Sequence, residues 1–303
     1  MSLVLDIGEF LAAHGPCTGA DLLALTGWEV LTLWKACRTQ PGIIMRRVGR
    51  RFLRLDKEVE GYARLSPSIR REFLTYTVVG RAEQEEQIAA RGLELQREFV
   101  RISQYKRQVA HDAVRRVVES SPNRERLLTH VCAVIAGDVV YGMAHAVERP
   151  EPSTGRLVRG SDLDVVIVAD EEIAPEEREA LDAALYREKW NMLVLPEWRE
   201  ELDYIVKDVS KVLTQLQFDD FRHKVACKIL HESEFLYGSM ALFARLKRLV
   251  GEFDIPQHLA RLEAQAVQQR EVAETQLAER PEMEHDPTWQ HLFFTSEERE
   301  EIY

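Results

Sequence analysis

Residues 160–170 read GSDLDVVIVAD, which places Asp162 and Asp164 at the start of an apolar run, residues 165–168. The β-branched residues of that run predict a buried strand. Because successive side chains of a strand point to opposite faces, the two aspartates point to the same face. Like charges this close repel each other and resist desolvation. The stretch is therefore either the solvated end of a strand or part of a site that binds cations.

Two further features of the sequence favour the cation site. Upstream, the predicted strand VCAVIAG, residues 131–137, ends at Gly137, and a glycine directly after a buried strand lets the backbone approach an anionic group closely. Downstream, ELDYIV, residues 201–206, places Asp203 on another predicted strand. Three carboxylates from neighbouring strands would destabilise the fold unless they bound cations, and hard oxygen ligands suit magnesium. The sequence thus predicts a magnesium site, with manganese as the alternative ion, formed by Asp162, Asp164 and Asp203.

These residues follow one another in an order that resembles the nucleotidyltransferase superfamily containing DNA polymerase β. The order is a buried strand, two spaced glycines, a Ser-Asp-x-Asp-apolar segment and an apolar-Asp-apolar segment. It is carried by Gly137 and Gly142, by residues 161–165 and by residues 202–204, and the resemblance covers about residues 125–235. It implies an α+β fold in which a polymerase β-like domain contains a mixed sheet.

The resemblance also implies an activity and the residues that carry it. A nucleoside monophosphate would pass from a nucleoside triphosphate to a hydroxyl acceptor, with release of pyrophosphate. Asp162 and Asp164 would bind a magnesium ion that bridges the triphosphate, and Asp203 would join them on a second ion that lowers the pKa of the attacking hydroxyl. The expected nucleotide-binding residues are Gly137, Asp138, Ser161, Lys224 and Lys228.

The chain departs from the family pattern at two places. Asp138 stands where the family usually has a serine, and it would weaken nucleotide binding, add a metal ligand or turn away. A loop-like insertion, ERPEPSTGRLVRG, separates Gly142 from the aspartates, and Arg156 and Arg159 in it are either phosphate contacts or solvated loop residues. The departure at Asp138 also supports a second function, a nucleic-acid-binding regulator whose nucleotidyltransferase domain has become a nucleotide sensor.

The first 75 residues predict a compact domain of three helices, at about residues 3–14, 20–25 and 29–39, followed by two β-prone arms around Val48 and Gly49. Three helices followed by a hairpin resemble a winged helix-turn-helix, over this segment alone. The hairpin is basic, as a wing lying along phosphates would be, but such domains also bind proteins, so contact with DNA or RNA and contact with a protein stay open. The expected phosphate contacts are Arg46, Arg47, Arg50, Arg51 and Arg54.

The pattern of the whole chain predicts four regions. They are a winged helix-like domain at residues 1–78, a linker helix bent near Gly92 at 79–122, a nucleotidyltransferase core at 123–215 and a C-terminal helical region at 216–303. Within them we expect a helix at about 175–189, strands at 191–196 and 202–209, and an amphipathic helix at about 221–239. The acidic tail, residues 280–303, is expected to pack back onto the domain.

Composition narrows the possible partners and the compartment. The net charge of −11 argues against a protein that coats nucleic acid with its whole surface, although residues 1–80 hold 11 basic and 8 acidic residues. No apolar run is long enough to span a membrane, and the N-terminus carries no basic leader, so we expect no membrane partner and a cytoplasmic location. The four cysteines are widely spaced and are expected to be reduced.

Overall fold

The computed structural model describes residues 7–57, 59, 61–151 and 153–279. They form an α+β chain that divides into two compact units. Unit 1 comprises the described residues up to Glu98 together with those from Arg261 onward, and unit 2 comprises Phe99–Ala260. The four regions expected from the sequence stay predictions beside this division into two units. The expected placement of the acidic tail lies outside the described residues.

Unit 1 is built from short helices around a three-stranded antiparallel sheet. The sheet has the order β1-β5-β2, with β1 at Cys17–Thr18, β5 at Thr77–Arg81 and β2 at Ile43–Arg47. The start of α2 is held by a capping box, because Thr18 and Asp21 exchange hydrogen bonds. A buried apolar cluster from α1 to α4 forms its core. The helices are α1 at Ile7–His14, α2 at Gly19–Thr26, α3 at Val30–Thr39 and α4 at Ile69–Thr75.

The hairpin expected around Val48 and Gly49 is wrong. Among the described residues, β2 pairs with β5, whereas the next strand, β3 at Phe52–Leu55, pairs with β4 at Ala63–Ser66. The Val48 N–H donates to the Tyr76 carbonyl at 2.8 Å, so the β2–β5 ladder continues where the turn was expected. The partner of β2 thus lies about thirty residues further along the chain.

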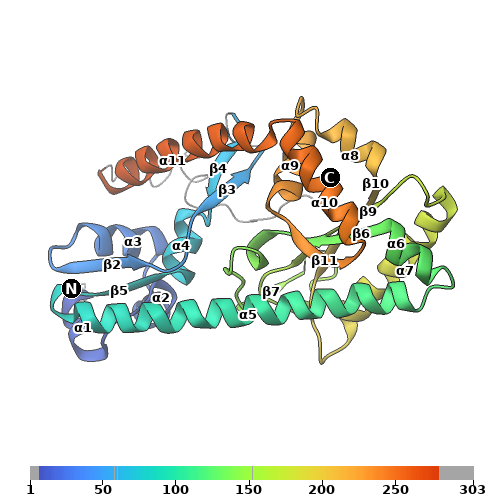
Figure 1. The fold of residues 1–303 in the computed structure, drawn as a ribbon. Helices are drawn as coiled ribbons and strands as arrows, with labels where there is room; N and C mark the ends of the chain where they lie inside the picture. Colours follow the sequence, from blue (N-terminus) through green and yellow to red (C-terminus); the bar gives the residue numbers. More distant parts are fainter. Residues whose placement is uncertain (1–6, 58, 60, 152, 280–303) are drawn as a thin grey trace. The chain divides into compact units, whose positions relative to one another are not determined.

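Two long helices run through the division between the units. Figure 1 shows α5, Glu85–Glu119, as one continuous helix, so the interruption expected near Gly92 does not occur. A single glycine costs a helix only about 1 kcal/mol relative to alanine. The buried apolar stripe of α5, which includes Ile88, Leu95 and Phe99, stabilises the helix by more than this cost. The second long helix is α11, Ile255–Glu279, preceded along the chain by α10, Met240–Glu252.

Unit 2 contains a four-stranded mixed sheet of order β10-β9-β6-β11. The central strands β9, Leu163–Ala169, and β6, Val131–Ile135, are buried throughout, as their apolar sequences predict. Strand β10, Leu202–Asp208, is parallel to β9, and β11, Glu234–Gly238, is antiparallel to β6. The remaining helices of unit 2 are α6 at Arg124–His130, α7 at Pro175–Val194, α8 at Val209–Gln215 and α9 at Phe221–Glu232, and 3₁₀ turns occupy Ala82–Gln84 in unit 1 and Gly137–Val139 in unit 2.

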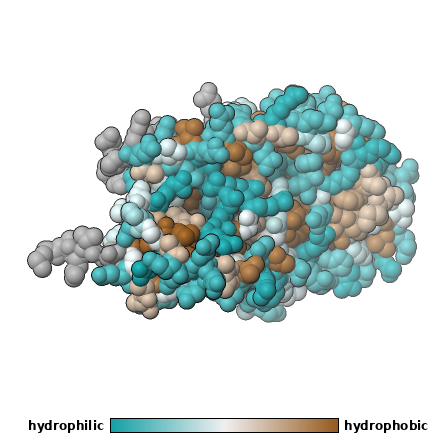
Figure 2. Space-filling model, turned by 60° about the vertical axis from the view of Figure 1, so that its left-hand side comes forward, coloured by the Kyte–Doolittle hydropathy of each residue, from teal (hydrophilic) through white to brown (hydrophobic). Residues whose placement is uncertain are grey.

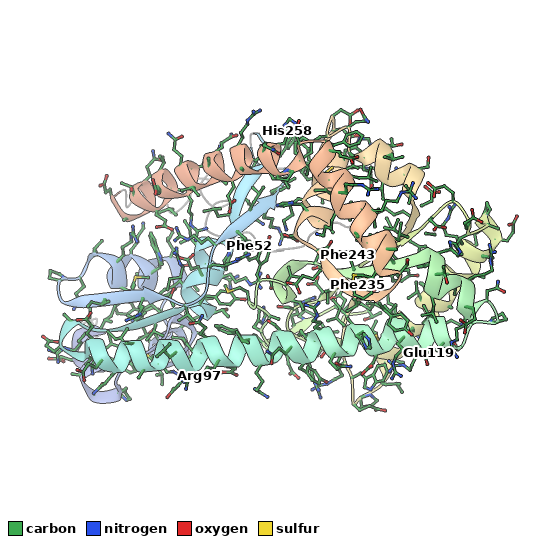
Figure 3. All side chains as sticks on the ribbon, viewed as in Figure 1. Phe52, Arg97, Glu119, Phe235, Phe243 and His258 are labelled. Atoms are coloured by element: carbon green, nitrogen blue, oxygen red, sulfur yellow. The ribbon has the colours of Figure 1, made fainter. Side chains whose placement is uncertain are left out.

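Two expectations for unit 2 are wrong. Residues 191–196 do not form a strand, because α7 continues to Val194 with Met192 and Leu193 buried, and it ends where Leu195 becomes extended before Pro196. Residues 221–239 do not form one helix, because α9 ends at Glu232 and β11 follows. Phe235 of β11 packs against Phe243 of α10 with ring centroids 5.7 Å apart (Figure 3). A short apolar run does not by itself distinguish a strand from a buried stretch of helix.

The molecular face drawn in Figure 2 is mainly hydrophilic, and its hydrophobic residues gather in separate small groups. None of the helices formed by the described residues has the length and apolar character needed to cross a membrane.

Candidate functional site

The three predicted aspartates lie at one edge of the sheet in unit 2. Asp164 and Asp203 occupy matching positions on the parallel strands β9 and β10, and Asp162 immediately precedes β9. Asp164 is buried, whereas the side chains of Asp162 and Asp203 retain 23% and 30% of their exposure. The sheet therefore brings together carboxylates that lie about forty residues apart in the sequence.

The Gly137 turn comes to the same edge. Strand β6 runs antiparallel to β9, so its end at Ile135 lies opposite Val165, and the Ala136 N–H donates to the Asp164 carbonyl at 2.9 Å. Gly137 has φ +68°, and a Cβ atom added there would lie 2.0 Å from Asp164 Oδ2. The turn is thus so close to the Asp164 carboxylate that only glycine fits. The approach of Gly137 to a phosphate stays a prediction.

Asp138 points toward the candidate site. The Ser161 hydroxyl donates to Asp138 Oδ2 at 2.9 Å, and the His145 N–H donates to the same hydroxyl at 3.3 Å. This contact does not favour the alternative in which Asp138 turns away, and weakened nucleotide binding and an added metal ligand both stay open. A fourth carboxylate joins the edge that holds Asp162, Asp164 and Asp203.

Two basic side chains that were not predicted face these acids. Arg149 places Nη1 2.7 Å from Glu201 Oε2 and Nη2 3.7 Å from Asp162 Oδ2, and its Nε donates to the Gly160 carbonyl at 2.9 Å. Lys189 of α7 donates to Asp203 Oδ1 at 2.8 Å. Five carboxylates, with Glu201 counted, thus face two cations, and the edge carries an excess of negative charge.

Burial and this excess of negative charge both raise the pKa of Asp162. Burial raises the pKa of its carboxyl, Arg149 opposes that rise, and the charges of Asp203 and Asp138 raise the pKa further. Burial likewise raises the pKa of Glu201, against the lowering effect of Arg149. A bound cation would favour the ionised form of each acid, so the cluster has the electrostatic character of a cation site.

The insertion before the aspartates is a short hairpin and not a loop. Strands β7, Glu148–Pro150, and β8, Leu157–Arg159, pair antiparallel, and the Glu151 carboxylate holds the turn by accepting from the backbone N–H and hydroxyl groups of Ser153 and Thr154. Arg149, on β7, is the arginine that reaches the acids. Arg156 is exposed, and among the described residues neither it nor the Arg159 side chain forms a hydrogen bond or ion pair with the aspartates.

A buried ion pair fixes the segments on either side of the site. Lys106 of α5 and Glu200, which precedes β10, are both almost completely buried, with Nζ 2.6 Å from Oε2. Lys106 also donates to the Arg159 carbonyl at 2.6 Å. Burial lowers the pKa of Lys106 and raises that of Glu200, and each partner opposes the shift of the other. The pair ties the end of the hairpin and the start of β10 to α5.

Glu232 of α9 reaches the Gly137 turn. It accepts from the Gly137 N–H at 3.2 Å, from the Tyr141 hydroxyl, and from Lys228 Nζ at 3.0 Å. Lys228 is buried in this pair, whereas Lys224 lies with Nζ 5.8 Å from the centre of the Phe218 ring. Lys228 therefore comes to the Gly137 turn through Glu232.

The donor chemistry of the aspartates fits magnesium, because all are hard carboxylate oxygens and the Gly137 turn leaves no room for a side chain beside Asp164. Within the described part of the chain, three metal-ligating atoms come within 4.8 Å of one another only at the exposed cluster of Asp219, Asp220 and His223. At the sheet edge, Asp203 is instead paired with Lys189. Binding an ion there would thus require Asp203 to exchange Lys189 for the metal.

A cavity of about 470 Å³ lies beside the edge strand β10. Its walls include Tyr204 and Val206 of β10 and Tyr186 and Lys189 of α7. Because Lys189 also bonds Asp203, the cavity adjoins the acids. It lies within the size range of small-molecule sites, roughly 300–1,000 Å³.

Of the arginines expected to contact phosphates, two have structural roles. Arg54 is buried in β3, and Arg51 forms bonds of 2.6 and 2.5 Å with Glu72 and Glu274. Neither side chain is placed as the expected hairpin would have placed it, because that hairpin does not form. Arg46, Arg47 and Arg50 are exposed.

Comparisons of the chain with protein-family models, with curated proteins and with solved structures found no match. The site must therefore be judged from its own residues. Sequence reasoning missed four residues of the site. Two carried a slight signal, since Glu201 directly precedes the predicted strand of Asp203 and Arg149 lies within the insertion. Lys189 and Glu232 carried no local signal.

Proposed function

We propose that unit 2 is a magnesium-dependent nucleotidyltransferase that moves a nucleoside monophosphate from a nucleoside triphosphate to a hydroxyl acceptor and releases pyrophosphate. The observation that carries the proposal is the gathering of Asp138, Asp162, Asp164 and Asp203 at one sheet edge beside the Gly137 turn. Four acids with two facing cations would oppose folding unless the protein bound further positive charge. The mixed sheet supports the polymerase β-like fold that the motif order implies.

In this proposal the chain positions the reactants and the aspartates hold the metal. Asp162 and Asp164 would bind magnesium, and Asp203 would join them once Lys189 releases it. Magnesium, or manganese in its place, neutralises the triphosphate and lowers the pKa of the attacking hydroxyl. The cavity beside β10 is our proposed acceptor site, since Lys189 both lines it and contacts Asp203. Most of the rate enhancement would come from positioning and charge neutralisation.

The test is transfer from a nucleoside triphosphate labelled at the α-phosphate, with release of pyrophosphate followed in parallel. Asp164→Asn should lower kcat/KM at least about a hundredfold, since a metal clamp contributes several kcal/mol to the transition state. Asp112→Asn replaces a half-buried carboxylate of α5 far along the chain from the motif and is the matched control, expected to leave activity within about twofold. Equal activity of the wild type and Asp164→Asn would contradict the proposal.

The second candidate is the nucleotide-sensing regulator, and Glu232 is the observation that favours it. An acid bonded to the Gly137 N–H and to Lys228 competes with a phosphate for both donors. Magnesium-dependent binding of a triphosphate by calorimetry, without transfer to any acceptor, would support this function over the enzyme. The absence of binding for each of the four common triphosphates would exclude both.

The N-terminal elements support the proposal of a winged helix-turn-helix in unit 1. Three helices are followed by the antiparallel strands β2 and β5, with β3, β4 and α4 inserted between them. We propose DNA or RNA contact through Arg46, Arg47 and Arg50. A mobility-shift assay of the full chain tests it: Arg46→Ala and Arg50→Ala should each weaken binding, and the affinity should fall steeply with salt.

A further inference from the structure

Unit 1 contains a cavity of about 200 Å³ whose walls combine arginines with a tryptophan. It is bounded by α3, β2, α4, β5 and α11, all from residues of unit 1. The charged and aromatic residues in its walls are Trp34, Arg38, Arg47, Arg51, Glu72, Phe73 and Glu274.

The positive charges of this cavity outnumber the negative ones. Glu72 and Glu274 are shared by two largely buried arginines: Arg51 lies 2.6 and 2.5 Å from them, and Arg270, behind the wall, lies 3.4 and 2.8 Å from them. Burial alone would raise the pKa of Glu274, but the neighbouring guanidinium groups hold it below its usual value, so the carboxylate stays ionised. Two acids thus neutralise two arginines, and two further arginines remain.

These two arginines are Arg38 and Arg47. Arg38 lies 3.5 Å from Glu274, which Arg51 and Arg270 already bond more closely, and its guanidinium sits 5.6 Å from the centre of the Trp34 ring. Within the described part of the chain, the Arg47 side chain has no hydrogen bond or ion pair. Because side chains alternate along β2, Met45 and Arg47 face the cavity and Arg46 does not.

We propose that this cavity binds a small phosphate monoester. Such a group carries a charge of about −1.5 to −2 at neutral pH, which matches the two excess arginines. Guanidinium groups bind phosphate oxygens in a bidentate manner, and the Trp34 and Met45 side chains offer an apolar wall for the carbon portion of the ester. The cavity is smaller than the roughly 300 Å³ at which drug-sized sites begin, so the ligand has few atoms beyond the phosphate.

This inference does not depend on the nucleotidyltransferase proposal, because every residue in it belongs to unit 1. It does bear on the proposed nucleic-acid contact. A ligand on Arg47 would neutralise one of the three exposed arginines, so the small phosphate and a nucleic-acid backbone would compete for that side chain.

The test is calorimetric titration of the full chain with inorganic phosphate and, separately, with methyl phosphate. We expect saturable binding at one site per chain, and Arg47→Ala should weaken it about tenfold or more, as expected for the loss of a charge-assisted hydrogen bond. Arg46→Ala removes the same charge from the opposite face of the same strand and should change the affinity less than about twofold. If methyl phosphate bound more tightly than inorganic phosphate, the site would be assigned to a phosphate ester. If the two bound equally, the site would be assigned to free phosphate.

Three results would overturn the inference. One is the absence of saturable binding of either probe at about 10 mM, a concentration that would reveal millimolar affinity. Another is equal weakening by Arg46→Ala and Arg47→Ala, which would indicate general electrostatic attraction. The third concerns the binding of a short DNA duplex in phosphate-free buffer. If both variants bound the duplex equally more weakly and neither probe competed with it, Arg47 would belong to a nucleic-acid surface. Both substitutions are at exposed positions, so circular dichroism should show that both variants fold.

Discussion

Gly137 is the residue at which the sheet edge is most closely constrained. Its positive φ alone disfavours any L side chain, and an added Cβ would also collide with Asp164 Oδ2. Gly137→Ala should therefore displace the Asp164 carboxylate and lower the free energy of unfolding by about 2 kcal/mol or more. Urea denaturation measures the loss of stability, and magnesium titration in the absence of nucleotide measures the loss of the site.

Gly155 provides a control for the backbone contribution. It has φ +69°, nearly the same as Gly137, but an added Cβ would meet nothing within 4 Å. Gly155→Ala should cost about 1 kcal/mol from the backbone alone and leave magnesium binding unchanged. If both substitutions had equal effects on metal binding, the close approach of Gly137 to Asp164 would have no part in the site.

Lys207 of β10 makes the stability of unit 2 depend on pH. Burial lowers its pKa from 10.5 to about 8, although its Nζ donates to Gln215 Oε1 at 2.8 Å. Above pH 8 the folded protein loses this proton while the unfolded chain keeps it, so the unfolded state binds more protons and stability rises with pH. Cys132 and Cys227, whose pKa burial raises from 9.0 to about 12, oppose this rise above pH 9.

The useful window for testing Lys207 is therefore pH 8 to 9. Urea denaturation at both values should show the wild type gaining up to about 1.4 kcal/mol of unfolding free energy relative to Lys207→Met. The comparison within one pair of proteins cancels the contribution of Lys247, whose pKa burial also lowers to about 8. A constant difference between the two proteins would mean that Lys207 titrates normally in the folded state.

At the scale of elements, periodicity predicted the helices and strands that their own residues specify. It failed for the pairing of strands that lie far apart in the sequence. The buried runs of β6 and β9 and the stripe of α5 were predictable because their own residues specify a strand or a helix. The partner of β2 was not, because β5 follows only after an inserted hairpin and helix. Residues 191–196 were assigned wrongly, since Met192 and Leu193 are buried by tertiary packing of α7 and not by a sheet.

The Lys106–Glu200 pair joins three elements and can be tested by a double-mutant cycle. Lys106→Met leaves Glu200 buried without its cation and should lower the free energy of unfolding by about 3–5 kcal/mol. Adding Glu200→Met should recover most of that loss, because the desolvated charge is then removed as well. Urea denaturation of the four proteins gives the coupling energy.

The control for this cycle is an exposed pair on the same helix. Arg91 and Glu94 lie 3.2 Å apart with both side chains exposed, and their cycle should give at most about 1 kcal/mol. If the double variant Lys106→Met/Glu200→Met were as unstable as Lys106→Met alone, the Lys106–Arg159 bond and not the ion pair would hold the segments together.

At the scale of the molecule, the aspartates of the candidate site were predictable because a short motif carries them. Arg149, Lys189 and Glu232 were not, because each comes from a different element and faces the acids only after folding. The sequence therefore indicated the aspartates of the site. It indicated neither the basic side chains that pair with them nor the further acid at the Gly137 turn. Whether a metal must displace Lys189 depends on the basic side chains, and whether a phosphate must displace Glu232 depends on this further acid.

The two units should respond separately to the two proposed ligands. Each has its own buried core, and a ligand stabilises the unit that binds it by about 2.7 kcal/mol at a hundredfold excess over Kd. Hydrogen exchange should therefore show methyl phosphate protecting α3 and β2, and magnesium with a triphosphate protecting β9 and β10. Arg47→Ala should abolish the first effect alone, and Asp164→Asn the second alone.

Helices α5 and α11 make this expectation a stringent one, because both run through the division between the units. If opening were cooperative over the whole chain, either ligand would slow hydrogen exchange in α3, β2, β9 and β10 alike. Each substitution would then abolish only the effect of its own ligand. If the units open independently, protection should end within α5 near Glu98, where unit 1 gives way to unit 2. Protection of β9 and β10 by methyl phosphate in the Arg47→Ala variant would contradict both cases, since it would require a phosphate site in unit 2.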